Sequence, residues 1–256
     1  MTPMSPHSHD LTHPDALTHL REHGFALLAP DALAAQAGVT LDALQALDAG
    51  WADLPPDEHL KDGGRYRRRR HGSFVQDVAA GQLAAVPHRP HWQPTTYNAL
   101  HGGMLRWFAP LDAAMAASPA FLAVVRRLGT LFAAAASTRA DGRFDGRWCI
   151  EAHPFRIDTT GGVGRPTPEG AHRDGVDFVA VLLIGRHRVL GGETRVFDAH
   201  GPHGVRFTLD QPWSALLLDD ARVIHESTPI QPDGADGGWR DTLVLTYRAG
   251  DFQDPP

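Results

Sequence analysis

The chain has 256 residues, of which 42% are hydrophobic and 21% are charged, a composition typical of a globular protein with a sizeable core. The formal net charge of −6 argues against a general nucleic-acid binder, for which a basic balance is expected. A single cysteine, Cys149, excludes an intrachain disulfide and a cysteine-based zinc site.

No 18-residue apolar stretch exists, and the first residues lack a basic segment followed by an apolar one. We therefore expect no membrane partner, no export signal and a cytoplasmic protein. Residues 1–15 are rich in histidine and are predicted to be a flexible N-terminus. Residues 16–256 are predicted to form one domain, whose oligomeric state the sequence leaves open.

The part of this domain up to about residue 145 is predicted to be mainly helical. Residues 14–23 carry helix start and stop signals, and residues 40–47 follow a threonine N-cap. A longer helix is predicted over residues 118–132, where apolar residues recur at helical spacing. Residues 62–103 are rich in Gly, Pro, His and Arg, and we expect loops and short strands around a pocket there.

From Trp148 onward the pattern becomes strand-like. Short runs rich in Val, Leu, Ile, Phe and Thr alternate with turn residues, at 148–157, 176–184, 193–198, 205–209, 214–218, 222–226 and 242–248. Several strands without intervening helices predict a β-sandwich or jelly-roll core over about residues 146–250. The run 176–184 is too apolar for a half-exposed strand, so we expect the N-terminal helices to help cover both its faces.

His172 and Asp174 form a His-x-Asp motif that can bind a metal ion. Side chains at i and i+2 of a strand lie on the same face, so an imidazole and a carboxylate can reach one ion together. The motif alone is weak, because the His and Asp content of the chain gives about 1.5 chance matches. A second match, at His13 and Asp15, is predicted to be a helix start because Pro14 lies between them.

The later strands add the groups that this motif needs. His225 lies at the end of one strand-like run, and Arg240 leads into the last. Two imidazoles and one carboxylate are the ligand set that binds non-haem Fe(II) with coordination positions left open. A nearby arginine can hold a co-substrate that carries a carboxylate.

Longer segments resemble a known family. They are residues 62–74, 166–186, 191–198, 219–230 and 240–248. These segments resemble the bacterial 2-oxoglutarate/Fe(II)-dependent dioxygenase family that includes L-isoleucine 4-hydroxylase, over most of the chain from about residue 60 onward. The resemblance implies a mainly β fold with helical additions, namely a double-stranded β-helix (jelly roll, cupin-like) with N-terminal and flanking helices.

The same resemblance implies a catalytic metal centre. His172, Asp174 and His225 would bind Fe(II) and leave positions for 2-oxoglutarate and O2. The implied enzyme hydroxylates an unactivated C–H bond of a small substrate, a free L-amino acid, and releases succinate and CO2. The substrate identity and the carbon that is oxidised are not given by the sequence.

The resemblance also implies a binding site for the co-substrate. Arg240 would pair with the distal carboxylate of 2-oxoglutarate, and Thr242 or Tyr247 would add a hydroxyl hydrogen bond. A guanidinium suits this role because its rigid fork of donors gives a bidentate contact. Two alternatives stay open, which are a surface ion pair of Arg240 with a neighbouring aspartate and the use of Arg222 as the clamp.

Five further residues are candidates for substrate contacts. Tyr66 and one arginine of the following run, such as Arg69, can bind a substrate carboxylate, although a solvated face is the other interpretation of that run. Glu169 either binds a substrate amine or caps a turn. Tyr97 and Asn98 lie in the irregular middle section and are candidates to line the pocket.

Two other classes of protein remain open from the sequence. A zinc-dependent hydrolase can also use two histidines and a carboxylate, but the chain has no HExxH helix. A non-catalytic metal-binding jelly-roll protein that acts as a sensor or binder would not need an arginine in register after the distal histidine. The arrangement of the four residues therefore favours the dioxygenase.

Overall fold

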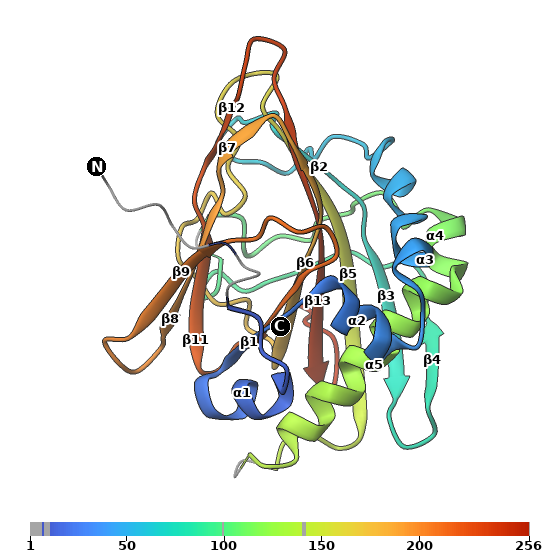
Figure 1. The fold of residues 1–256 in the computed structure, drawn as a ribbon. Helices are drawn as coiled ribbons and strands as arrows, with labels where there is room; N and C mark the ends of the chain where they lie inside the picture. Colours follow the sequence, from blue (N-terminus) through green and yellow to red (C-terminus); the bar gives the residue numbers. More distant parts are fainter. Residues whose placement is uncertain (1–6, 8–10, 99, 140–141, 256) are drawn as a thin grey trace.

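The structure is a computed structural model of the chain, and it describes all residues except 1–6, 8–10, 99, 140–141 and 256. Its strands form one large antiparallel sheet and two smaller sheets, and most helices lie along one face of the large sheet (Figure 1). This arrangement confirms the predicted fold class, a mainly β jelly roll with helical additions. The predicted flexible N-terminus lies largely outside the described residues.

The large sheet has the strand order β1-β10-β6-β13-β5-β3-β4, and β2 pairs with one end of β5. Its strands are β1 (Phe25–Leu28), β2 (Arg67–Arg69), β3 (Gly72–Asp77), β4 (Gln82–Ala85), β5 (Arg147–Asp158), β6 (Phe178–His187), β10 (Ala215–Asp219) and β13 (Trp239–Ala249). The two long strands β5 and β13 pair along their whole length, and β13 has a register shift against β6 between Asp241 and Thr242.

The second sheet has the order β11-β8-β9, and a short pair β12-β7 extends beyond it. These strands are β7 (Val189–Gly191), β8 (Glu193–Asp198), β9 (Gly204–Thr208), β11 (Val223–Ser227) and β12 (Ile230–Pro232). Apolar side chains of β8, β9 and β11 pack against the inner face of the large sheet, with Val196, Phe207 and Val223 in one buried cluster. The two sheets therefore enclose an interior.

The helices cover the outer face of the large sheet. They are α1 (Ala16–His23), α2 (Pro30–Ala37), α3 (Leu41–Gln45), the 3-10 helix η2 (Asp48–Trp51), α4 (Ala113–Ala117) and α5 (Pro119–Ala136). Helix α5 begins at an N-cap serine, because the Ser118 hydroxyl oxygen accepts a hydrogen bond from the Phe121 amide and Pro119 takes the first helical position. Its apolar face packs against the sheet through residues such as Phe132, whose ring stacks on Phe178.

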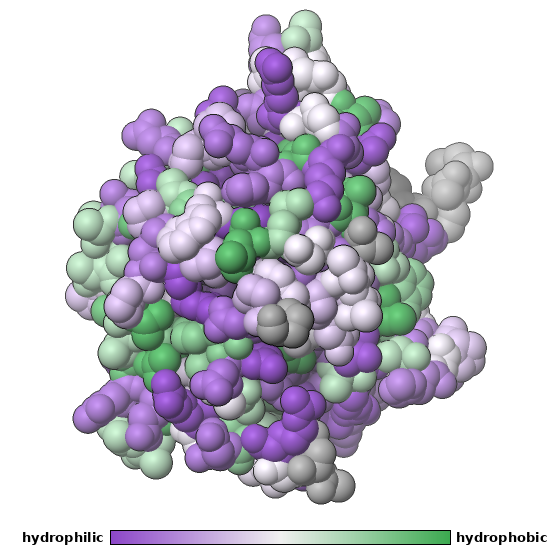
Figure 2. Space-filling model, turned by 180° about the vertical axis from the view of Figure 1, so that it is seen from behind, coloured by the Kyte–Doolittle hydropathy of each residue, from purple (hydrophilic) through white to green (hydrophobic). Residues whose placement is uncertain are grey.

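Helix α5 is also long and apolar enough to cross a membrane by length and composition alone, which the expectation from the sequence did not allow for. More than half of its residues are buried inside the protein, so burial in the core explains its apolar character. On the face seen in Figure 2, hydrophobic side chains lie in small groups between hydrophilic ones.

Strand β6 is buried on both faces, as its uniform apolar sequence predicted. Phe178, Ala180 and Leu182 belong to the cluster that includes the helices, whereas Val179 and Leu183 belong to the cluster between the two sheets. Alternate residues of a strand point to opposite faces, so a strand between two apolar layers needs no polar positions.

Two features differ from the sequence-based expectation. The N-terminal part, predicted to be mainly helical, supplies β1 to the large sheet, whereas β2, β3 and β4 fall within residues 62–103, where short strands were expected. In addition, β6 begins at Phe178, so His172 and Asp174 lie in the loop before the strand rather than on it. The cause is that the amides of residues 174–176 donate to the side chain of Asp220 and are unavailable for a strand ladder.

Candidate metal centre and cavity

The structure brings His172, Asp174 and His225 together at one end of the interior. His172 pairs with His225 across an isolated antiparallel bridge, in which each amide donates to the other residue's carbonyl at 3.0 Å. The Asp174 carboxylate lies between the rings, 3.9 Å from Nε2 of His172 and 3.7 Å from Nε2 of His225. One nitrogen of each ring and one oxygen can therefore face a single ion.

The surroundings of the two imidazoles suit a metal ligand. Nδ1 of His172 donates to the Gly170 carbonyl at 2.9 Å, so in its neutral form the ring offers the Nε2 lone pair to the ion. Burial, with help from His172, holds the pKa of His225 well below its ordinary value and keeps that ring neutral. Burial also lowers the pKa of His172, but the carboxylates of Asp174 and Glu169 outweigh it and raise the value overall. A bound cation would replace the proton that these carboxylates favour.

Asp220 fixes the backbone of the Asp174 loop. This fully buried residue follows β10, and its carboxylate accepts from the amides of Asp174 at 2.9 Å, Gly175 at 2.8 Å and Val176 at 3.2 Å. Its carbonyl also accepts from Nε of Arg173 at 2.6 Å. Burial and the nearby Asp174 raise the pKa of Asp220 above its ordinary value. The sequence reasoning missed this residue, since an aspartate after a strand is an ordinary turn signal.

Arg240 lies in the same cavity and has free donors. It is 2% exposed, and its Nε and Nη2 atoms have no hydrogen-bond partner in the part of the chain that the structure describes. Burial, followed by repulsion from Arg186, lowers the pKa of Arg240 to about 10, which leaves it charged at neutral pH. An anion that entered the cavity would meet a desolvated guanidinium with two donors to spare.

Side chains alternate between the two faces of a strand, and this alternation, or parity, decides which residues of β13 line the cavity. Arg240, Thr242, Val244 and Thr246 line it, because residues two apart lie on one face. Tyr247 has the other parity, and its hydroxyl donates to the Val125 carbonyl in the helical core. The suggestion that Tyr247 contacts the co-substrate is therefore wrong, whereas Thr242 is correctly placed for that role.

The structure also bears on the two alternatives, which were an ion pair of Arg240 with a neighbouring aspartate and the use of Arg222 as the clamp. The Asp241 carboxylate pairs with Arg156 at 2.6 Å, and Asp236 pairs with Arg188 at 2.9 Å, so neither aspartate pairs with Arg240. Arg222 lies at the surface, where its guanidinium donates to the backbone carbonyls of Arg21 and Glu22 in α1. It does not line the cavity.

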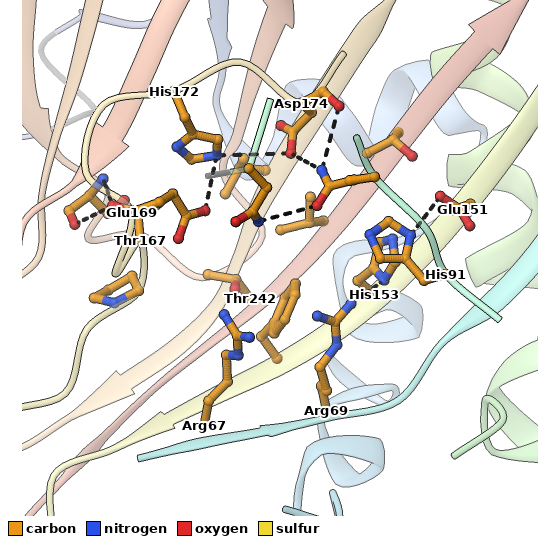
Figure 3. A pocket seen from close by; sticks show the side chains of 18 of the residues that line it. Arg67, Arg69, His91, Glu151, His153, Thr167, Glu169, His172, Asp174 and Thr242 are labelled. Carbon is orange, nitrogen blue, oxygen red and sulfur yellow. Dashed lines mark hydrogen bonds and ion pairs between the residues drawn. The ribbon is translucent and has the colours of Figure 1, made fainter. Parts of the chain in front are cut away.

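The cavity has a volume of about 130 Å³, which limits its occupants to small molecules. Of the predicted substrate contacts, Arg69, Asn98 and Glu169 line it. Figure 3 shows Arg67 and Arg69 rising from β2 towards the ligand loop that carries Glu169 and His172. Arg67, another arginine of the run from which a substrate contact was expected, also lines the cavity, because residues two apart on a strand lie on the same face.

Two of the predicted tyrosines lie elsewhere. Tyr66 precedes β2 with the opposite parity, and its hydroxyl donates to Asp62 at 2.6 Å beside a separate surface hollow. The ring of Tyr97 packs against Gly175, where a side chain would clash with it, and Tyr97 lines a second cavity. Both predictions are therefore wrong for the cavity that contains the metal ligands.

Gln93 is a further cavity residue, which no motif or pattern in the chain indicated. Its side-chain amide donates to both the carbonyl and the Oδ1 atom of Asp174, each at 3.4 Å. Its Oε1 atom accepts from Nη2 of Arg106 at 2.9 Å. The residue thus connects the metal ligand to a buried arginine on the other wall.

A second group of buried residues also has metal-ligand chemistry. It comprises His71, His91, Glu151 and His153, which we call the Glu151 cluster. The Glu151 carboxylate is 3.1 Å from Nε2 of His71 and 3.0 Å from Nδ1 of His91. Three of the four line the cavity, and the polar residues at 151 and 153 of an apolar strand were the signal that could have found them.

Charge separates the two groups as metal sites. Arg69 places Nη2 2.6 Å from Nδ1 of His153, and Arg89 places Nη1 3.6 Å from Glu151. Two guanidiniums beside the Glu151 cluster oppose a divalent cation, and both oxygens of Glu151 already face imidazoles. By contrast, Asp174 and Glu169 are the charged groups nearest His172, and both are anionic. The surrounding charge therefore favours His172, Asp174 and His225 over the Glu151 cluster as the predicted metal ligands.

Asp220→Ala should lower the affinity for Fe(II) by about 10- to 100-fold, because the three amides that hold the Asp174 loop lose their acceptor. Anaerobic titration with Fe(II) measures this affinity. Asp233→Ala, at an exposed aspartate in the bend after β12, is the matched control and should leave it unchanged. Equal affinity in Asp220→Ala and the unaltered protein would show that the loop holds its position without Asp220.

Acid should destabilise the protein between pH 6.5 and about 4. Burial lowers the pKa of His91 to about 4 and holds that of His153 well below its ordinary value, so the unfolded chain takes up protons that the folded chain does not. Each such histidine should remove up to about 1.4 kcal/mol of unfolding free energy per pH unit across that window.

Denaturant unfolding at a series of pH values measures this slope. His91→Gln should make it shallower, whereas His200→Gln, at an exposed histidine, should not. An equal slope in His91→Gln and in the unaltered protein would contradict the assignment of a neutral, buried imidazole at His91.

Comparison with known structures shows close relatives of the fold. A bsmA homolog from Methylobium petroleophilum PM1 is 60% identical, covers 99% of this chain and 97% of its own, and has a TM-score of 0.87. IDO from Bacillus thuringiensis is 18% identical, covers 93% of this chain and 99% of its own, and has a TM-score of 0.74. The Fe(II)/α-ketoglutarate-dependent dioxygenase TqaL is 19% identical, covers 93% of this chain and 89% of its own, and has a TM-score of 0.70. The curated proteins gave no match.

A family model gives the assignment. The model of the 2OG-Fe dioxygenase family matches residues 48–246, which include all three residues of the metal centre, the buried Arg240 and the arginines of β2. Members of this family use Fe(II), 2-oxoglutarate and O2, which agrees with two imidazoles, a carboxylate and a free guanidinium around one cavity. The match covers well over half of the sequence, and the chain belongs to the 2OG-Fe dioxygenase family.

Proposed function

We propose that this dioxygenase hydroxylates an unactivated C–H bond of a small free L-amino acid, with Fe(II) held by His172, Asp174 and His225. The observation that carries the proposal is the shared cavity. Three metal-ligating atoms and the unpartnered donors of Arg240 face one small interior space that also holds charged groups of both signs.

The residues of the metal centre fit Fe(II) by their donor chemistry. Two neutral imidazoles and one carboxylate occupy at most three positions, which leaves room for a co-substrate and O2. Gly170 fixes the His172 ring from behind, and Asp220 fixes the backbone of Asp174. Preorganised ligands of this kind need no rearrangement of the chain when the ion binds.

Arg240 fits the distal carboxylate of 2-oxoglutarate. Its Nε and Nη2 atoms lack partners, and a carboxylate can accept from two guanidinium nitrogens at once. Thr242 lies two residues on along the same face, so its hydroxyl can supply a further hydrogen bond. Val181 and Val244 line the cavity near these groups and exclude water from the buried ion pair.

When bound, Fe(II), 2-oxoglutarate and O2 supply the oxidation, in which one oxygen atom enters the substrate C–H bond, the other enters succinate, and CO2 is released. The chain itself positions the reactants. His172, Asp174 and His225 would fix the place of the ion, Arg240 would fix the orientation of the co-substrate, and the side chains that line the cavity limit the access of bulk water.

A small substrate with charges of both signs agrees with the cavity. Its volume is about 130 Å³, and its walls carry arginines, glutamates and apolar side chains together. A free aliphatic amino acid has a carboxylate, an ammonium and an apolar side chain in a molecule of suitable size. The family assignment supports a small-molecule oxygenase, and the amino-acid class is our proposal.

His225→Ala should lower Fe(II) affinity by more than about 100-fold and abolish succinate production, because it removes one of three ligands. Anaerobic Fe(II) titration and mass spectrometry of a mixed amino-acid pool after admission of air measure the two effects. His203→Ala, at an exposed histidine, should change neither. His91→Gln should retain iron, and loss of iron in that variant instead of in His225→Ala would transfer the metal to the Glu151 cluster.

Arg240→Gln should raise the concentration of 2-oxoglutarate needed for half-maximal turnover by at least about ten-fold and leave Fe(II) affinity unchanged. The reason is that glutamine keeps a donor but loses the charge and the fork. Arg222→Gln is the matched control, since that arginine lies at the surface. An unchanged requirement in Arg240→Gln would mean that another cation binds the co-substrate.

A further inference from the structure

One wall of the cavity carries buried charged groups whose bonding capacity is only partly used. Nη2 of Arg67, Nε of Arg106 and Oε2 of Glu169 have no hydrogen-bond partner among the described residues. Arg67 is 6% exposed and Arg106 is 2% exposed. Leaving a charged donor or acceptor buried and unpaired is costly, so a cluster of three such atoms on one cavity indicates a place for a ligand.

Arg67 is held so that one nitrogen remains available. It lies on β2, where its inward parity directs it into the cavity while Arg68 points out. Its Nε donates to Oδ2 of Asp57 at 2.7 Å, and the side chain of Asp57 is itself fully buried. Asp57 therefore fixes the guanidinium from behind and leaves Nη2 for a second anion.

Arg106 approaches the same space from another segment. The backbone of Arg106 pairs with that of His91, and Nη2 donates to Oε1 of Gln93, which leaves Nε without a partner. Burial, followed by repulsion from Arg67, lowers the pKa of Arg106 to about 10. The two guanidiniums thus lie close enough to repel each other, and an anion between them would remove that repulsion.

Glu169 supplies the opposite charge beside the metal centre. Its Oε1 atom lies 3.6 Å from Nε2 of His172, and its Oε2 atom is buried and free. Arg69 lines the same wall, but its guanidinium stacks 3.7 Å from the Phe108 ring and its Nη2 contacts His153. The protein therefore covers one face of the Arg69 guanidinium and engages one of its nitrogens, although its Nε, like the three atoms above, has no partner among the described residues.

We propose that this wall is the site for the polar end of the substrate, in which Arg67 and Arg106 bind an α-carboxylate and Glu169 binds an α-ammonium group. The inference rests on the proposed function and deepens it, because it names the residues that would recognise the α-carboxylate and the α-ammonium group of the substrate. It is separate from the co-substrate site, where Arg240 provides the cation.

The chemistry of the wall distinguishes three classes of small molecule. An amino acid satisfies both arginines and the glutamate. A simple carboxylic acid leaves Glu169 unpaired, and a simple amine leaves two guanidiniums unpaired. Each missing contact to a buried charged group should weaken binding by about ten-fold or more.

The test uses the full-length protein loaded with Fe(II) and 2-oxoglutarate without oxygen, so that binding is measured and turnover is not. Calorimetric titrations with L-leucine, L-isoleucine, L-valine and L-methionine show which amino acids bind. The one that binds best is then compared with its analogue that lacks the amino group and its analogue that lacks the carboxylate. We expect both analogues to bind at least about ten-fold more weakly.

Substitutions assign the contacts to residues. Arg106→Gln should weaken binding of the amino acid by at least about ten-fold, and Glu169→Gln should weaken binding of the amino acid more than that of the analogue without an amino group. Arg106→Lys keeps the charge and should bind with intermediate affinity, which separates a lost contact from a damaged fold. Arg68→Gln, on the outward face of the same strand as Arg67, is the control and should bind normally.

The outcomes separate this inference from the proposed function. Equal binding of the amino acid and of both analogues, or unchanged affinity in Arg106→Gln and Glu169→Gln, would overturn it. A protein that binds Fe(II) and 2-oxoglutarate but none of the four amino acids would also overturn it, while the metal and co-substrate sites would stand. Failure to bind Fe(II) or 2-oxoglutarate would instead overturn the proposed function.

Discussion

The pair of backbone hydrogen bonds between His172 and His225 is the constraint on which the metal centre depends. It joins the loop before β6 to β11, so the two imidazoles are placed by strand geometry, while Asp220 holds the amides beside Asp174. The large sheet on one side and the small sheet on the other keep these segments in register. A metal centre built in this way needs little adjustment by its own side chains, because the backbone has already brought the ligands together.

The distribution of charge follows from the same geometry. The anionic Asp174 and Glu169 lie next to the imidazole of His172, and arginines line the same cavity. The Glu151 cluster has imidazoles and a carboxylate too, but its neighbouring guanidiniums make it a hydrogen-bonded wall rather than a site for a cation. Residue type alone therefore does not identify a metal site, and the sign of the surrounding charge has to be considered.

Several parts of this arrangement were predictable from the sequence, and the errors have definite causes. The jelly-roll class and the burial of both faces of β6 follow from hydrophobic patterns, and the resemblance directed attention to His172, Asp174 and His225. Tyr247 and Tyr66 failed because each has the wrong strand parity, which could have been counted from Arg240 and Arg69. Asp220, Gln93 and Arg106 were not predictable, since tertiary contacts between distant segments bring them to the site.

The attachment of β2 to the end of β5 has a consequence for how such an enzyme can diversify. The metal ligands come from the loop before β6 and from β11, while Arg67 reaches the cavity from a three-residue strand outside the main path of the sheet. Arg67, a residue of the proposed substrate site, thus comes from a different piece of the chain than the proposed metal ligands, whereas Glu169 shares the loop of His172. Exchange of the peripheral strand and its supporting aspartate can re-tune what enters the cavity, while the oxidising machinery is inherited intact.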